Sequence, residues 1–344
     1  MQAVILAAGK STRTYPLTVT RPKPLLKLAN KTLLEYNLDN LNNIVSEAII
    51  VVGYKKNMIE DYFGNKYKNI RIRYVEQKEQ LGTAHALSVA EPCIKDRFIL
   101  LMGDDIYSLE NIKECIKYKY SITTARVKNP ENFGVIIEKN GIFIDVIEKP
   151  QKFISDLVSI ALFSFDKKIF RFIKKIKKSE RNEFELPDAI KLLSQEEKII
   201  IIKAKEWCPI VYSWDLLKFD SKIRKGKNNI RKNTKIYGKV ITSSIGSNCI
   251  VKGDVENSII MDNAIIDRGS FIGDSIVGEN VYFKGTIIAK NDAYSVIKDK
   301  KIKAGRLGAI IGDNCKLMNV IINPGCKIWP NTEIKNKKIE NDVL

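Results

Sequence analysis

A six-residue repeat in the last third of the chain constrains its fold more than any other feature. From residue 236 to residue 334 an aliphatic side chain recurs about every six positions with glycine close behind it, as at Ile245-Gly246, Ile272-Gly273 and Ile311-Gly312. Each unit predicts one short strand whose aliphatic side chain fills an interior, while glycine or asparagine turns the corner into the next strand. Since three units make one coil, this span allows about four or five stacked coils.

The first 219 residues follow a different pattern, in which short apolar runs alternate with amphipathic stretches. Buried strands are predicted over Ala3–Ala7, Glu47–Val52, Ile70–Val75 and Phe98–Met102, and helices over Thr32–Asn43, Lys56–Phe63 and Thr83–Ala90. This alternation predicts an α/β fold with a doubly wound, Rossmann-like parallel sheet. Ligands of such sheets bind beyond the carboxyl ends of the strands.

The pattern becomes mixed after residue 105. Antiparallel strands are predicted over Ser121–Val127, Gly134–Glu138, Ile142–Glu148 and Leu157–Phe165, followed by helices over 167–177 and 187–193, a strand over 198–204 and a helix near 214–219. We therefore expect one domain over residues 1–219. The basic, polar segment 220–235 predicts a linker to the repeat domain at 236–334, in which residues 290–306 form a protruding loop, and residues 335–344 form a tail.

Composition narrows the class of protein. A hydrophobic content of 44% with 28% charged residues is typical of a globular chain. No apolar run approaches the roughly 20 residues of a membrane helix and the first run lacks signal-peptide flanks, so we expect a cytoplasmic protein without a membrane partner. The six scattered cysteines form no C-x-x-C pair, which argues against a zinc site or a disulfide framework.

The net charge of +18 would suit the binding of nucleic acid. Because the lysines are spread along the chain, we expect no nucleic-acid partner.

The residues after the first apolar run are suited to a bound phosphate. Gly9 lets the backbone approach a ligand, so that successive N–H groups would converge on an anion, and Ser11 and Thr12 add hydroxyl donors. Arg13 adds a planar, permanent positive charge, and Lys23 lies between two prolines that are expected to keep its backbone extended. The alternative is an ordinary turn with solvated charges.

The stretch A-A-G-K-S-T-R-x-x-P-L-T-x-x-R-P-K-P-L, residues 7–25, resembles the signature of the sugar-1-phosphate nucleotidylyltransferases. The resemblance implies that Arg13 grips a nucleoside triphosphate and that Lys23 neutralises charge at the α-phosphate. Ser11 stands where the family has its second glycine. The nucleotide contacts implied in this region are Leu6, Ala8, Gly9, Ser11 and Thr12.

Two later strand ends extend the resemblance. Gln77 and the pair Gly82-Thr83 follow a strand and open a helix, where the family reads a pyrimidine base, although Thr83 also suits a helix cap. Asp104 follows the strand that ends at Met102. By resemblance it is the metal ligand, and its hard oxygen atoms suit Mg²⁺. Asp105 either supports this ligand or forms the turn.

Residues after the second set of strands resemble the sugar side of the family's site. Glu148-Lys149-Pro150 matches the family's E-K-P, in which the lysine contacts the sugar phosphate and the glutamate contacts the sugar hydroxyls. Gly134 would let the backbone approach the sugar. Ser159 lies where relatives often have a sugar-contacting asparagine.

The stretch Trp207 to Leu217 departs from the pattern that it resembles, W-x-D-I-G-x-P-W-D-L-L. Pro209 takes the place of the aspartate that is the family's second metal ligand, and proline has no side-chain oxygen. A bound Mg²⁺ would then depend on Asp104, the phosphates and water, with Asp215 as a possible substitute ligand unless it caps the following helix.

The repeats resemble the left-handed β-helix of hexapeptide acyltransferases. Archaeal-type relatives with this layout often acetylate an amino sugar phosphate with a histidine of the β-helix. The single histidine of this chain, His85, lies in the first domain, and Asn314 stands where those relatives have theirs. Because asparagine cannot act as a general base, we expect the β-helix to be an assembly scaffold, with a homotrimer by analogy.

Together these residues predict a transferase that joins UTP or dTTP to glucose-1-phosphate or N-acetylglucosamine-1-phosphate, releases pyrophosphate and uses Mg²⁺. Three alternatives remain open. They are guanylyl transfer to mannose-1-phosphate, a non-catalytic regulatory subunit that senses nucleotide sugars, and a bifunctional enzyme that also acetylates glucosamine-1-phosphate without a histidine.

Overall fold

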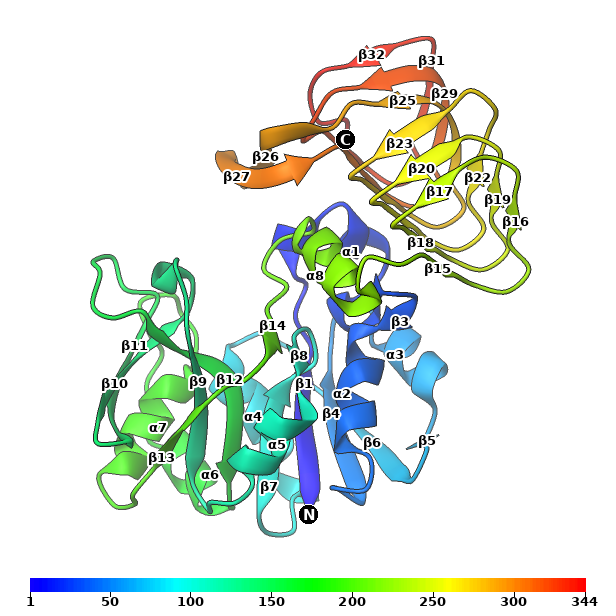
Figure 1. Ribbon diagram of the computed structural model, residues 1–344. Coiled ribbons are helices and arrows are strands. Elements are labelled where there is room, and N and C mark those ends of the chain that lie inside the picture. Colours follow the sequence, from blue (N-terminus) through cyan, green and yellow to red (C-terminus); the bar gives the residue numbers. More distant parts are fainter. The chain divides into compact units, whose positions relative to one another are not determined.

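The computed structural model describes residues 1–344, which form two compact units (Figure 1). The first unit comprises Met1–Gly9 and Leu33–Pro209, and the second comprises Lys10–Thr32 and Ile210–Leu344. Residues 10–32 thus interrupt the first unit in sequence but pack with the last third of the chain. None of the helices has both the length and the apolar character needed to cross a bilayer.

A mixed sheet is the centre of the first unit, with the order β10-β11-β13-β9-β12-β7-β1-β4-β6-β5. Its strands are β1 (Gln2–Ala7), β4 (Glu47–Val52), β5 (Lys66–Tyr67), β6 (Ile70–Glu76), β7 (Phe98–Met102), β9 (Ser121–Arg126), β10 (Gly134–Lys139), β11 (Ile142–Glu148), β12 (Leu157–Phe165) and β13 (Ile200–Lys203). The predicted parallel sheet is confirmed for β7, β1, β4 and β6. Every residue of β1 and β4 is buried, which is why these runs lack polar alternation. β12 runs antiparallel to β7 and β9.

Helices bury the apolar side chains of this sheet. They are α2 (Leu33–Leu41), α3 (Lys56–Phe63), α4 (Thr83–Ser88), α5 (Leu109–Cys115), α6 (Lys168–Ile173) and α7 (Leu186–Ser194). One core cluster joins Val4 and Leu6 of β1 to Leu87 of α4, Phe170 of α6 and Ile190 of α7. A short ribbon pairs β8 (Ile106–Tyr107) with β14 (Trp207–Cys208). Neither α5 nor this ribbon was predicted.

Most of the second unit is a parallel β-helix, as the repeat predicted. Its strands are β15 (Asn229–Ile230), β16 (Lys235–Ile236), β17 (Val240–Ile241), β18 (Ser244–Ile245), β19 (Ile250–Val251), β20 (Asp254–Glu256), β21 (Ile259–Ile260), β22 (Ile265–Ile266), β23 (Phe271–Gly273), β24 (Ile276–Val277), β25 (Tyr282–Ile287), β28 (Ile310–Ile311), β29 (Lys316–Ile322), β30 (Lys327–Ile328), β31 (Glu333–Lys335) and β32 (Lys338–Ile339). In the sheet β15-β18-β21-β24-β28-β30 all neighbours are parallel. One interior column is fully buried and consists of Ile245, Ile260, Val277, Ile311 and Ile328.

Asparagines turn one corner of every coil beside this column. Asn248, Asn263, Asn280, Asn314 and Asn331 all have positive φ, a conformation that asparagine tolerates better than most residues. Their amides donate in series from coil to coil over 3.0 to 3.2 Å. We call this series the asparagine ladder. Asn314, which by resemblance stands at the position of an acyltransferase histidine, is one of its rungs.

Three expected segments differ from the structure. Residues 290–306 are not a loop but the antiparallel hairpin of β26 (Lys290–Ile297) and β27 (Lys300–Leu307). The expected linker 220–235 contains the end of α8 (Asp215–Arg224) and the strands β15 and β16, which pair with later coils. The expected tail contains β32, which pairs with β29. The β-helix therefore extends at both ends, because its backbone groups are paired beyond the clear repeats.

The segment 10–32 contains α1 (Leu17–Thr20), β2 (Lys27–Leu28) and β3 (Lys31–Thr32). The carboxylate of Asp220 on α8 fastens it to the β-helix. Asp220 accepts from the backbone N of Ala29 at 2.7 Å and from the Ser244 hydroxyl at 2.8 Å. Its other oxygen is 2.5 Å from Nε of Arg224, and both side chains of this ion pair are almost fully buried.

Candidate active site

The carboxyl ends of β1, β4, β6 and β7 meet at one edge of the sheet in the first unit. The backbone N of Gly103 donates to Leu6 O at 2.8 Å, and the backbone N of Tyr54 donates to Ala8 O at 3.0 Å. A Cβ atom on Gly53 would lie 3.0 Å from both Ala8 Cβ and Gln77 O. The structure thus brings Leu6, Ala8, Gln77 and the turn after β7 to the edge where ligands of such sheets bind.

The turn that carries Asp104 is held through its neighbour Asp105. The indole Nε1 of Trp207 donates to Asp105 Oδ2 at 3.1 Å, and the side-chain amide of Asn37 donates to Asp105 O at 2.7 Å. Asp105 therefore fixes the turn, which was one of its two predicted roles. Asp104, the preceding residue of this turn, is the carboxylate proposed for a metal.

Gln77, Gly82 and Thr83 support the loop in which they lie. The Gln77 amide donates to Gly82 O at 3.1 Å and lies 3.1 Å from Nδ1 of His85. Gly82 has φ +100 and a Cβ there would be 2.5 Å from Phe184 O, so only glycine fits. The predicted cap by Thr83 is wrong, because Gly82 is the N-cap of α4 and the Thr83 hydroxyl accepts from the backbone N of Leu186 at 3.1 Å. Contact of these residues with a base remains a proposal.

The residues assigned to the sugar side lie on the strands β10, β11 and β12 or, in the case of Lys149, directly after β11. Gly134 of β10 pairs with Glu148 of β11, and a Cβ on Gly134 would lie 2.9 Å from the Glu148 carboxylate. Lys149 has φ +47, and its ammonium is 3.0 Å from Glu148. On β12 the Ser159 hydroxyl accepts from the backbone N of Ala161 at 3.1 Å. Glycine at position 134 thus makes room for a carboxylate of this chain.

Two residues of this region carried no motif in the sequence. The guanidinium of Arg181 lies 2.6 Å from Glu185 and 3.6 Å from Glu148, which adds a cation beside Lys149. Tyr107 is fully buried, and its hydroxyl accepts from the backbone N of Met102 at 3.3 Å and donates to Ala161 O at 3.4 Å. It therefore joins the end of β7, beside Asp104, to the segment that holds Ser159.

Burial raises the pKa of the Tyr107 hydroxyl well above its ordinary value, and the negative charges of Asp105 and Asp104 add to this effect. Tyr107 therefore keeps its proton at neutral pH. A hydroxyl that stays protonated can continue to donate to Ala161 O, so the link between the two strands is not lost by titration.

Ser11, Thr12, Arg13 and Lys23 belong to the second unit. Ser11 has φ 51 and ψ 54, and its carbonyl accepts from Thr14 N at 3.1 Å, Thr14 Oγ1 at 2.8 Å and Thr18 Oγ1 at 2.9 Å. The loop therefore closes on the carbonyl of a residue in the left-handed region, a conformation that suits the glycine of the signature that this stretch resembles. Arg13, on a 3-10 helix over Thr12–Thr14, is exposed.

The extended backbone predicted at Lys23 is wrong. Pro22 is extended, with ψ 147, but Lys23 is the first residue of a 3-10 helix over Lys23–Leu25. The ring of Pro24 fixes φ at a value that also suits the first turn of a helix. Between its two prolines Lys23 thus has a 3-10 helical backbone and not the extended backbone that was expected.

Asp215 is neither the N-cap of α8, which is Trp214, nor an uncommitted carboxylate. Its Oδ2 accepts from the backbone N of Val211 at 2.9 Å and of Tyr212 at 2.7 Å. Burial raises the pKa of Asp215, and these two N–H groups and the positive charges of Lys218 and Lys23 oppose the rise. Asp215 therefore holds the turn before α8.

Asp104, the proposed metal ligand, suits a metal ion that binds together with the phosphates of the nucleotide. No group of three or more His, Cys, Asp or Glu side chains in the chain forms a metal cage. Mg²⁺ is commonly held by one or two carboxylates together with substrate phosphates and water, so Asp104 and a triphosphate are a suitable set of donors.

Comparison with known proteins gives the family. Residues 2–223 match the model of the family described as nucleotidyl transferase. The chain is 36% identical to the "Bifunctional protein GlmU" of Methanocaldococcus jannaschii, with 96% of this chain and 92% of that protein covered. It is 31% identical to a "Bifunctional sugar-1-phosphate nucleotidylyltransferase/acetyltransferase" of Sulfurisphaera tokodaii, with 95% of this chain and 94% of that protein covered. It is also 34% identical to the "UTP--glucose-1-phosphate uridylyltransferase AglF" of Haloferax volcanii, with 58% of this chain and 86% of that protein covered. The chain belongs to the nucleotidyl transferase family of sugar-1-phosphate nucleotidylyltransferases.

Proposed function

We propose that this chain transfers a nucleotidyl group from a nucleoside triphosphate to a hexose-1-phosphate and releases pyrophosphate. The proposal rests on the edge of the first unit's sheet at which the carboxyl ends of β1, β4, β6 and β7 meet. There the residues assigned to the nucleotide, Leu6, Ala8 and Gln77, share one edge with Asp104. The Tyr107 hydroxyl connects this edge to the strand of Ser159, on the sugar side.

In the proposed reaction a phosphate oxygen of the sugar phosphate attacks the α-phosphorus in line. The bond between the α-phosphorus and the oxygen that bridges to the β-phosphate breaks, and pyrophosphate leaves with the electron pair. Arg13 and Lys23 stabilise the negative charge on the transferred group and on the leaving group. Lys149 and Glu148 hold the sugar phosphate.

The family generally uses a divalent metal ion, and we propose that it is Mg²⁺ here. Asp104 would hold it, without help from position 209, where the chain has proline. When bound, Mg²⁺ supplies positive charge that offsets the charge of the phosphates.

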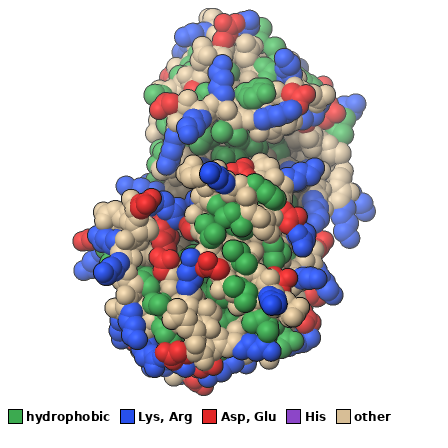
Figure 2. Space-filling view, turned by 90° about the vertical axis from the view of Figure 1, so that its left-hand side faces the viewer, with side chains coloured by type: hydrophobic (Ala, Val, Ile, Leu, Met, Phe, Trp, Pro, Cys, Tyr) green, Lys and Arg blue, Asp and Glu red, His purple; other side chains and the backbone are tan.

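UTP or dTTP is the proposed donor, and glucose-1-phosphate or N-acetylglucosamine-1-phosphate the proposed acceptor. The uridylyltransferase of Haloferax volcanii supports a uridine nucleotide. Guanylyl transfer to mannose-1-phosphate is the second choice within the class. A nucleic-acid substrate is not proposed. On the face in Figure 2 basic side chains lie among acidic and hydrophobic ones.

Steady-state pyrophosphate release tests this proposal over a panel of UTP, dTTP, GTP, ATP and CTP with each of the three sugar phosphates. We expect release with a pyrimidine triphosphate and a gluco-configured sugar phosphate. Release only with GTP and mannose-1-phosphate would favour the second choice. Tight binding of a nucleotide sugar without release from any pair would favour a regulatory subunit and refute the proposal.

Acetyl transfer is a second candidate, because the relative in Sulfurisphaera tokodaii is named for both activities and is similar over nearly the whole chain. A β-helix activity would have to proceed without histidine, because the only histidine of the chain is His85. Asn314 is engaged through both ends of its amide in the asparagine ladder. Release of free coenzyme A from acetyl-CoA and glucosamine-1-phosphate, unchanged in Asn314→Ala, would establish it.

We also propose a cytoplasmic homotrimer formed through the β-helix, by analogy with hexapeptide acyltransferases. Buried thiols suit a reducing compartment, and burial raises the pKa of Cys249 and Cys315 to about 11. Sedimentation equilibrium of the full chain measures the assembly, and a monomer at micromolar concentration would contradict the trimer.

A further inference from the structure

Three carboxylates are stacked at one corner of the β-helix. Asp262, Glu279 and Asp313 follow the paired strands β21, β24 and β28 at the same position of successive coils, with Ser247 at this position one coil earlier. The backbone N of Ser247 donates to Asp262 Oδ1 at 2.9 Å, and that of Glu279 donates to Asp313 Oδ1 at 2.7 Å. Asp262, Glu279 and Asp313 are hereafter the acid column.

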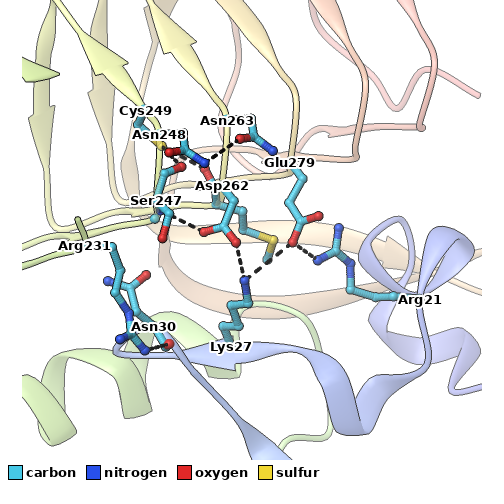
Figure 3. Close-up of polar contacts among 12 residues, drawn as sticks. Arg21, Lys27, Asn30, Arg231, Ser247, Asn248, Cys249, Asp262, Asn263 and Glu279 are labelled. Carbon is cyan, nitrogen blue, oxygen red and sulfur yellow. Dashed lines mark hydrogen bonds and ion pairs between the residues drawn. The ribbon is translucent and has the colours of Figure 1, made fainter. Parts of the chain in front are cut away.

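The second oxygen of each aspartate contacts a basic residue of the segment 10–32. Figure 3 shows Lys27 against Asp262 and Glu279, and Arg21 against Glu279. Lys27 Nζ is 2.5 Å from Asp262 Oδ2 and 3.7 Å from Glu279 Oε1. The Arg21 guanidinium donates from one nitrogen to Glu279 and from the other to Asp313. One planar fork thus binds carboxylates of two successive coils, a geometry that a lysine cannot reproduce.

These contacts are shielded from water. The Arg21 side chain is 8% exposed and that of Asp313 is 6% exposed. Burial acts to lower the pKa of Arg21, but the charges of Asp313 and Glu279 outweigh it and the pKa is raised. Loss of one partner in such a setting leaves an uncompensated buried charge, so the segment would move to rehydrate it.

The same segment is fastened a few residues further on. The Asn30 amide donates to Asn229 O and Ile245 O, both at 2.9 Å, and Arg231 donates to Asn30 O. Lys23 lies between Arg21 and Lys27 in sequence, and Arg13 precedes them in the same segment. The proposed catalytic cations are therefore carried by a loop whose charged anchors are side chains of the β-helix.

We propose that Arg21 is a positioning residue for nucleotidyl transfer and that the acid column of the β-helix sets the conformation of the loop bearing Arg13 and Lys23. This inference rests on the proposed function. It gives the β-helix a role in the reaction of the first domain, beyond assembly.

The test compares full-length Asp313→Asn, Glu279→Gln and Arg21→Lys with the matched control Asp267→Asn. Asp267 is a β-helix acid that contacts Tyr282 and Lys252 and no residue of the segment 10–32.

Two properties of each variant are measured: the kcat and KM for pyrophosphate release, and the rate of amide hydrogen exchange in residues 10–26. We expect kcat to fall about tenfold or more in the three variants, with the KM of the sugar phosphate changed less than about threefold, and exchange in residues 10–26 to accelerate. The control should match the wild type in both.

Arg21→Lys combined with Asp313→Asn provides a second check, because residues that act as one unit are not additive. The double variant should lose no more kcat than the worse single variant. Wild-type kcat in all three single variants would overturn the positioning role even if exchange accelerated, since the loop would then be held for stability only. Unchanged exchange would overturn it as well. An inactive wild type would instead refute the proposed function.

Discussion

Ser11 is the residue at which this chain departs most clearly from the resemblance at its first loop. Its φ of 51 and ψ of 54 lie in the left-handed region, which costs an ordinary residue about 1 kcal/mol relative to glycine. We expect Ser11→Gly to raise the free energy of unfolding by about 0.5 to 1 kcal/mol, as measured by urea denaturation. The matched substitution Thr12→Gly, in the adjoining 3-10 helix, should lower it. A loss of stability in Ser11→Gly would contradict this account.

Asp104 is predicted to govern the response to Mg²⁺. Because position 209 has proline, which offers no side-chain oxygen, Asp104→Asn should lower the rate of pyrophosphate release about a hundredfold and raise the Mg²⁺ concentration needed for half-maximal rate. Pro209→Asp, which restores a second oxygen ligand, should lower that concentration. A Mg²⁺ titration of the rate checks both, and an unchanged titration curve for Asp104→Asn would refute its role.

For single residues, the sequence predicted which positions matter better than it predicted the hydrogen bonds that they make. The resemblance singled out Gln77, Thr83 and Asp105, but Gln77 and Thr83 make hydrogen bonds that no motif foretold. Tyr107 and Arg181 were missed because their contacts with Ala161 and Glu148 join segments that are distant in sequence. No local pattern reports such pairings.

The asparagine ladder is an element whose stability can be measured rung by rung. Asn280→Ala removes the amide that joins Asn263 to Asn314 and places alanine at φ +57, so we expect it to lower the free energy of unfolding by about 1 to 3 kcal/mol. Asn280→Gly restores the backbone freedom and should lose less. The control Asn341→Ala, at an exposed position, should be neutral, and the rate of pyrophosphate release should not change in any of them. Equal stability of Asn280→Ala and wild type would contradict the role of the ladder.

The stability of the fold is expected to depend on pH through Glu47, at the start of β4. Glu47 is 3% exposed and accepts from the Gln2 amide at 2.7 Å and from Arg71 at 2.6 Å. Burial raises the pKa of Glu47, but the hydrogen bonds from Gln2 and Arg71 outweigh it and the pKa is lowered from 4.5. A lowered pKa means that the ionised group stabilises the fold above about pH 4.5 and that this contribution is lost as the pH falls through the folded-state pKa.

Glu47→Gln is therefore expected to cost about 1 to 3 kcal/mol at pH 7 and clearly less at pH 4. Urea denaturation of both proteins at the two pH values measures the difference. The same cost at both pH values would show that the charge of Glu47 does not contribute.

Elements with one clear period were predicted well. β4, β7, β11, β12 and α3 have the predicted bounds, because their apolar patterns and turn residues agree. The hairpin of β26 and β27 was missed, although Ala293, Ser295 and Ile297 alternate with more exposed neighbours, because its many lysines favoured a loop. In the segment 220–235, basic composition similarly concealed strands that are defined by pairing with later coils.

For the whole molecule, the sequence predicted an α/β part and a β-helix but not how the chain is divided between them. Residues 10–32 follow β1 without a break, yet they pack with residues 210–344. Their anchors, among them Asp262, Glu279 and Asp313, are more than 200 residues away in sequence. The signal that could have shown this was the recurrence of an acid after successive hexads, which becomes meaningful only when the coils are in register.

A single-turnover reaction of the full chain with UTP and glucose-1-phosphate tests the central claim most directly. We predict that the wild type and the control Lys252→Ala, a β-helix surface lysine, form a uridine diphosphate sugar and pyrophosphate in equal amounts. Lys23→Ala should keep its fold but form both products about a hundredfold to a thousandfold more slowly. Product formation by Lys23→Ala at the wild-type rate would contradict the account.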